Sequence, residues 1–175
     1  MKSYEFKCGV VVGRFSPLHI GHERIIKLAL ERCEEVVIIV TSNDKIDDKN
    51  PYSLEYRIYL IKKVFSKFIS DKRLKIATIT GDRKIDKSYG NYILKIVKEV
   101  SGKEADFIVY GNDKDIEKCF SKEAIKSINR LQVDRKEVDI SATKIRKALK
   151  KHDFEFLNKY LNPLVYEEIE ILENI

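Results

Sequence analysis

The stretch that most constrains the fold is residues 13–22, Gly-Arg-Phe-Ser-Pro-Leu-His-Ile-Gly-His. It follows an apolar run, residues 8–12, and precedes residues 25–30, in which apolar side chains recur with helical spacing. An apolar run that passes through a glycine into an amphipathic segment predicts a buried strand followed by a helix. In an open parallel sheet, the turn between the two is the usual phosphate site.

The residue types in this turn suit an anion. Gly13 has no Cβ, so a ligand can approach the backbone closely. Gly21 and His22 open the expected helix, whose free N–H groups and positive dipole end attract anions. His19 and His22 lie three residues apart and can face one phosphate. Zinc is not expected, because it normally takes at least three protein ligands and the chain has one further histidine, His152.

Strands and helices alternate along the chain. The patterns predict strands at residues 6–12, 35–40, 74–80, 107–110 and 129–133, and helices at residues 21–33, 54–69, 91–100, 115–120, 142–150, 153–160 and 163–172. This order predicts an α/β fold: a Rossmann-like open parallel β-sheet of about five strands, with helices on both faces and a C-terminal helical extension. Ligands in such sheets bind beyond the carboxyl ends of the strands.

A second candidate phosphate motif lies at residues 139–146, Asp-Ile-Ser-Ala-Thr-Lys-Ile-Arg. Ser141 is a suitable N-cap for the helix expected after it. Arg146 follows one turn later, so its side chain can project beside the same helix N-terminus. Spacing alone favours a capped amphipathic helix without a ligand.

Together, the two motifs resemble the two signatures of the nucleotidyltransferase superfamily, whose members join a nucleoside monophosphate to a phosphorylated acceptor. The resemblance implies contacts to the triphosphate and to the reacting phosphorus from Arg14, His19, His22 and Arg146. It implies nucleotide binding at further positions, namely Gly13, Phe15, Gly21, Gly111, Asn112, Ile140, Ser141 and Thr143.

Three features resemble the archaeal-type nicotinamide mononucleotide (NMN) adenylyltransferases and the related domain of the bacterial bifunctional NAD regulator. They are Arg14 after the glycine, the segment Asn-Pro-Tyr-Ser-Leu-Glu-Tyr-Arg-Ile at 50–58, and Val-Tyr-Gly-Asn at 109–112. Two positions depart from that pattern. The chain has no tryptophan to stack on nicotinamide, and Tyr92, or else Tyr89, lies in that region. Lys49 stands where the family has arginine. Lys49 and Tyr92 are the expected acceptor-site residues.

The resemblance implies transfer of AMP from ATP to the 5′-phosphate of NMN, giving NAD and pyrophosphate. Mg²⁺ is expected to bind mainly through the ATP phosphates, without a cage of protein ligands. The same chemistry with phosphopantetheine, FMN, or an alcohol phosphate and CTP remains an alternative. A non-catalytic nucleotide- or RNA-binding protein is a further one.

The composition sets the remaining expectations. With 175 residues, 43% of them hydrophobic, the chain is expected to form one nucleotidyltransferase domain over residues 1–175. The three cysteines are odd in number and far apart, which favours reduced thiols in a cytoplasmic protein. The formal charge of +6 fits polyphosphate ligands; no nucleic-acid or membrane partner is expected, and a homo-oligomer is left open.

Overall fold

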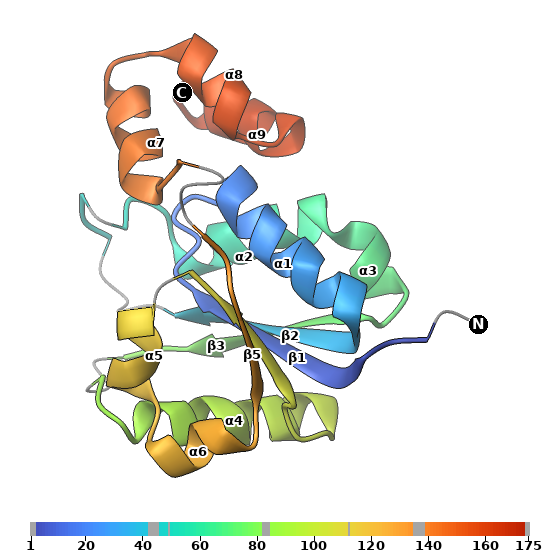
Figure 1. The fold of residues 1–175 in the computed structure, drawn as a ribbon. Helices are drawn as coiled ribbons and strands as arrows, with labels where there is room; N and C mark the ends of the chain where they lie inside the picture. Colours follow the sequence, from blue (N-terminus) through green and yellow to red (C-terminus); the bar gives the residue numbers. More distant parts are fainter. Residues whose placement is uncertain are drawn as a thin grey trace.

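A parallel sheet forms the centre of the computed structural model (Figure 1), which describes residues 3–41, 46–48, 50–81, 85–111, 113–134 and 139–173. Within these residues the sheet has the order β3-β2-β1-β4-β5, and all neighbouring strands pair in parallel. The strands are β1 (Phe6–Gly13), β2 (Cys33–Thr41), β3 (Leu74–Ile79), β4 (Phe107–Tyr110) and β5 (Asn129–Gln132). The predicted open parallel sheet is therefore confirmed.

Helices cover both faces of the sheet (Figure 1). One face carries α1 (Ile20–Arg32), α2 (Leu54–Val64) and α3 (Ser66–Ser70), while the other carries α4 (Tyr89–Ser101), α5 (Asp113–Cys119) and α6 (Lys122–Lys126). The C-terminal extension consists of α7 (Ala142–Lys150), α8 (Phe154–Tyr160) and α9 (Pro163–Glu173), and it packs on the α1 side. None of the helices in the described ranges has both the length and the apolar character that crossing a bilayer requires.

Strand β2 shows why the sheet needs both layers. The side chains of residues 36–40 are fully buried. Because successive side chains point to opposite faces, Val36 and Ile38 enter the core beneath α1, while Val37 and Ile39 enter the core beneath α4. A continuous β-branched run is typical of a parallel strand covered on both faces.

Two helical predictions needed correction. The helix expected over residues 54–69 is divided at Phe65, whose ψ of 22° departs from helical geometry although its N–H still donates to the Ile61 carbonyl. The Phe65 ring is 1% exposed, and its packing in the core is a tertiary constraint that apolar periodicity does not register. Helix α6 was not predicted; Ser121 caps it by accepting from the Ala124 N–H.

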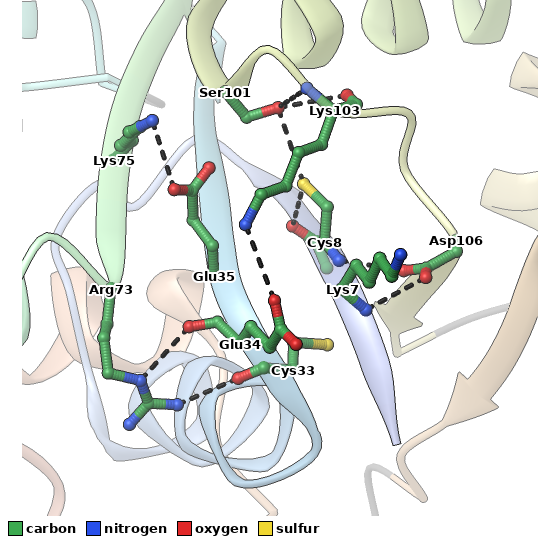
Figure 2. A network of polar contacts seen from close by, with 11 residues as sticks. Lys7, Cys8, Cys33, Glu34, Glu35, Arg73, Lys75, Ser101, Lys103 and Asp106 are labelled. Atoms are coloured by element: carbon green, nitrogen blue, oxygen red, sulfur yellow. Dashed lines mark hydrogen bonds and ion pairs between the residues drawn. The ribbon is translucent and has the colours of Figure 1, made fainter. Parts of the chain in front are cut away.

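Side chains also tie the amino ends of the strands together (Figure 2). Asp106, just before β4, accepts from the backbone N–H groups of Lys7 and Cys8 in β1. Arg73, just before β3, donates to the carbonyls of Cys33 and Glu34 at the start of β2. The carboxyl ends of the strands, at the opposite edge of the sheet, open onto a cavity.

Candidate active site

The cavity lies beyond the carboxyl ends of β1 and β4 and has a volume of about 810 Å³. Its lining includes Val12 and Gly13 from β1, Val109 and Tyr110 from β4, and Gly111 just after β4. Strands β1 and β4 are the neighbours at which the strand order reverses, so the cavity occupies the topological switch point where open α/β sheets bind ligands. It is lined by every predicted site residue that the structure describes except Tyr92: Gly13, Arg14, Phe15, His19, Gly21, His22, Gly111, Ile140, Ser141, Thr143 and Arg146.

The N-terminus of α1 is capped by a histidine. The Nδ1 atom of His19 accepts from the His22 N–H at 3.4 Å, and the His19 carbonyl accepts from the N–H groups of His22 and Glu23. The rings of His19 and His22 stack with centroids 3.7 Å apart. His19 is 5% exposed, and this burial lowers its pKa from 6.5 to about 4. It is therefore neutral at pH 7, and with Nδ1 accepting, its proton lies on Nε2.

The β1–α1 loop, residues 14–19, has a buried aromatic side chain at its centre. Phe15 adopts a left-handed backbone conformation, with φ of 51°, and is 1% exposed. A Cβ on Gly13 would lie 3.1 Å from its ring. The absence of a side chain at Gly13 thus makes room for Phe15, a reason the sequence prediction lacked. Because its ring is buried, the predicted nucleotide contact of Phe15 would have to be made by its backbone.

The second motif caps α7 as predicted. The hydroxyl of Ser141 accepts from the Lys144 N–H, and the Thr143 hydroxyl accepts from Arg146 Nη2 at 3.2 Å. Arg146 Nη1 also donates to the Ser16 carbonyl at 2.8 Å. This single side chain therefore links the two motifs through a bond between residues that lie 130 positions apart in the sequence.

Gly21 brings the two motifs into close contact. A Cβ on Gly21 would lie 3.0 Å from the Ile140 side chain and 3.1 Å from the His19 ring. The lack of a side chain at residue 21 therefore eases the close approach of helix α1 to the segment before α7. The two helix N-termini consequently open onto the same cavity.

Within the part of the chain that the structure describes, neither of the two predicted acceptor residues is placed in the cavity lining. Tyr92 is half-buried against the α4-side core and does not line the cavity, whereas Tyr89, one turn earlier in α4, does. Lys49 and Asn112 lie outside the described residues. Ile85 and Phe120 extend the apolar lining beside Tyr89.

Two residues, one in the cavity wall and one behind it, were not among the site residues predicted from the sequence. Ser16 lines the cavity while only 2% exposed, and its hydroxyl has no hydrogen-bond partner among the described residues. Arg57 in α2 is 1% exposed and donates to the Arg14 carbonyl. A signal for Arg57 exists: it lies three and four residues before the buried Leu60 and Ile61, so it occupies the apolar stripe of its helix.

The site is strongly cationic. Burial lowers the pKa of both Arg57 and Arg146, and the charge of Arg14 lowers both further. Three neighbouring guanidinium groups favour a polyanionic ligand, which relieves their mutual repulsion. Within the described ranges, no group of three or more His, Cys, Asp or Glu side chains is arranged to hold a metal ion.

An open parallel sheet with two capped helix N-termini and an arginine-histidine cluster at its switch point defines a nucleotide-binding α/β protein. The model of the Cytidylyltransferase-like family matches residues 10–148, and the chain belongs to this family. The prediction of a nucleotidyltransferase is thereby confirmed.

Curated relatives of this chain include archaeal adenylyltransferases. A nicotinamide-nucleotide adenylyltransferase of Sulfolobus acidocaldarius is 26% identical over 146 residues, which are 83% of this chain and 79% of the relative. That of Aeropyrum pernix is 32% identical over 107 residues, which are 59% of this chain and 58% of the relative. The predicted resemblance to archaeal NMN adenylyltransferases is confirmed.

The same fold occurs in a bifunctional NMN adenylyltransferase/ADP ribose pyrophosphatase of Francisella tularensis. Its structure superposes with a TM-score of 0.73 at 19% identity, over 97% of this chain and 50% of the other. This chain therefore spans about half the length of that protein. The Francisella protein has also been solved with AMP and a manganese ion.

Proposed function

We propose that the protein transfers AMP from ATP to the 5′-phosphate of NMN, releasing pyrophosphate and forming NAD, and that residues 1–175 act as one nucleotidyltransferase domain. The observation that carries the proposal is the hydrogen bond from Arg146 to the Ser16 carbonyl, because it joins both phosphate motifs at one cavity. The adenylyltransferase names of the curated relatives support the choice of nucleotide and acceptor.

The phosphate-binding half of the cavity carries the chemistry. The acceptor phosphate oxygen attacks the α-phosphorus of ATP in line, a bond forms between them, and the bond from that phosphorus to the β-phosphate oxygen breaks. A phosphate dianion is already a nucleophile, so the chain needs to supply position and charge rather than a base. Arg14 and Arg146 neutralise phosphate oxygens, and the N–H groups that open α1 and α7 receive the triphosphate.

The two histidines contribute differently. His19, neutral with its proton on Nε2, donates a hydrogen bond to a phosphate oxygen and orients the ring of His22 by stacking. His22 is the more exposed of the two and lies against the charge that develops at the α-phosphorus. The Ser141 and Thr143 hydroxyls bind the β- and γ-phosphates at the start of α7.

The other half of the cavity suits the two bases. Gly111, after β4, is assigned to the adenine side. We assign the acceptor base to Tyr89 rather than Tyr92, because Tyr89 lines the cavity beside Ile85 and Phe120. A tyrosine face can stack on a pyridinium ring in place of the missing tryptophan.

A divalent cation fits this site as part of the nucleotide. The described residues supply arginine, histidine and hydroxyl groups rather than a carboxylate cage, so Mg²⁺ is assigned to the phosphates and water. When bound there, it neutralises the charge that develops on pyrophosphate. The Francisella protein, of which this chain covers about half, has been solved with AMP and a manganese ion, in line with a role for a divalent cation.

Product analysis tests the proposal. Purified protein is incubated with Mg²⁺ and each combination of ATP or CTP with NMN, phosphopantetheine, FMN or glycerol phosphate, and both pyrophosphate and the coupled product are measured. NAD formation from ATP and NMN is expected to be the fastest. Turnover confined to CTP or to another acceptor would contradict it, and RNA binding with no turnover would favour a non-catalytic protein.

A further inference from the structure

Arg57 is buried beneath the β1–α1 loop and connects three elements at the edge of the cavity. Its Nη1 donates to the Arg14 carbonyl at 2.7 Å and to the Thr41 carbonyl at 3.0 Å, and its Nε donates to the Ser53 carbonyl at 3.3 Å. The guanidinium therefore joins the end of β1, the end of β2 and the N-cap of α2. Arg57 does not line the cavity.

These hydrogen bonds lie beyond the end of the pairing between β1 and β2, where no neighbouring strand among the described residues bonds to the Arg14 backbone. The last residues paired between β1 and β2 are Gly13 and Val40, so the ladder ends one residue before Arg14. Beyond it, Arg57 supplies a donor in place of the neighbouring strand. The planar fork of arginine can reach several carbonyls from one side chain.

The consequence concerns the other half of the same peptide group, the Phe15 N–H. In a trans peptide the carbonyl and the N–H point in opposite directions. Holding the Arg14 oxygen toward α2 therefore turns the Phe15 N–H away from α2. That N–H has no hydrogen-bond acceptor in the part of the chain that the structure describes.

Arg146 holds the loop from the other side. Its bond to the Ser16 carbonyl and the bond from Arg57 to the Arg14 carbonyl flank Phe15, the residue with the left-handed backbone. A side chain disfavours that conformation, so it persists only where its surroundings fix it.

We propose that Arg57 is a positioning residue for the triphosphate: by holding the Arg14 carbonyl, it presents the Phe15 N–H to a phosphate oxygen. This inference rests on the proposed function only in requiring that the cavity bind a polyphosphate. Arg57 itself touches no substrate. Its buried charge also adds to the positive potential beneath the loop.

The test compares Arg57→Lys with a matched variant, Arg73→Lys. Arg73 likewise donates to three backbone carbonyls, those of Leu30, Cys33 and Glu34, but at the amino end of the sheet (Figure 2 shows the last two of these bonds). Binding of inorganic tripolyphosphate is measured by calorimetry after circular dichroism has verified the fold. The dissociation constant is expected to rise about tenfold in Arg57→Lys, as for loss of a hydrogen bond to a charged group, and to stay within about twofold in Arg73→Lys.

An NMR titration gives a readout that a general loss of stability would not move. In the wild-type protein, the Phe15 amide resonance is expected to shift when tripolyphosphate is added, and in Arg57→Lys this shift is expected to be lost. Equal weakening in both lysine variants, or a Phe15 amide that ignores tripolyphosphate in the wild type, would overturn the proposal. The titration of the Phe15 amide in the wild-type protein can still be made if Arg57→Lys fails to fold. Neither measurement uses an acceptor or turnover, so a failure to make NAD would not affect them.

Discussion

The imidazole rings of His19 and His22 stack with their centroids 3.7 Å apart and their planes inclined by 24°. The stacking is possible because His19 does not belong to α1 but caps it, with φ of −145° and ψ of 168°, so its ring folds back over the first turn. One side chain of the first motif thus both caps a helix and lines the cavity.

Burial of His19 predicts a loss of stability in mild acid. Its pKa is 6.5 in the unfolded chain and about 4 in the fold, so between these values the unfolded chain binds a proton that the folded chain does not. The free energy of unfolding should fall as pH drops from 6.5 to 4, by roughly 3 kcal/mol in all. Urea titrations across this range measure it. His19→Asn, which keeps a capping side chain, should flatten the dependence; an unchanged slope would contradict the assignment.

His22→Ala is expected to lower turnover by about two orders of magnitude or more, because a contact to the charge that develops in the transition state is lost. The affinity for ATP should fall only modestly. Steady-state kinetics with NMN and ATP measure both. His152→Asn is the control, since His152 is exposed and Asn tolerates its left-handed backbone. Unaltered turnover in His22→Ala would refute the catalytic role.

Arg146→Lys should lower kcat/KM for ATP by about tenfold or more, since lysine keeps the charge but cannot bond Ser16 and Thr143 and also bind phosphate. The melting temperature should change little, because Arg146 is half-buried at the surface of the cavity. Arg130→Lys on the exposed face of β5 provides the comparison. Equal kinetics in the two variants would argue against a phosphate contact.

Tyr89→Leu is expected to raise KM for NMN by about fivefold, as for loss of an aromatic contact, and to leave KM for ATP nearly unchanged. Leucine retains apolar volume, so the core beneath α4 stays filled. The parallel substitution Tyr92→Leu tests the alternative tyrosine, which does not line the cavity. A larger effect on NMN in Tyr92→Leu would reverse the assignment.

Gly90→Ala should lower the free energy of unfolding by about 1–3 kcal/mol through overpacking. A Cβ there would lie 2.4 Å from the Phe120 ring and 2.8 Å from the Cys119 carbonyl oxygen. Helix propensity alone predicts the opposite sign, because alanine stabilises helices relative to glycine by about 1 kcal/mol. Asn91→Ala, at the exposed neighbour, isolates that propensity and should be neutral or stabilising. Denaturant titration of both variants measures the change in the free energy of unfolding and shows which sign holds at Gly90.

Sequence patterns predicted the strands well because parallel strands buried on both faces read as continuous apolar runs, as in β2. They located the Ser141 cap, because serine before an amphipathic segment is a local signal. They placed the start of the first helix at Gly21, one residue late, and did not predict that His19 caps it. They missed the break at Phe65 and the role of Arg57. Those depend on side chains packing against, or bonding to, parts of the chain that are distant in sequence.

The sequence by itself determined the order of strands and helices, and it predicted two helix starts whose residue types suit an anion, because both follow from local spacing and residue chemistry. Only the tertiary structure decided that the two starts open onto one cavity, that Tyr89 rather than Tyr92 lines it, and that Arg57 lies beneath Arg14. The reason is physical. Hydrogen bonds from Arg57 and Arg146 to carbonyls 43 and 130 residues away leave no periodic trace in the sequence.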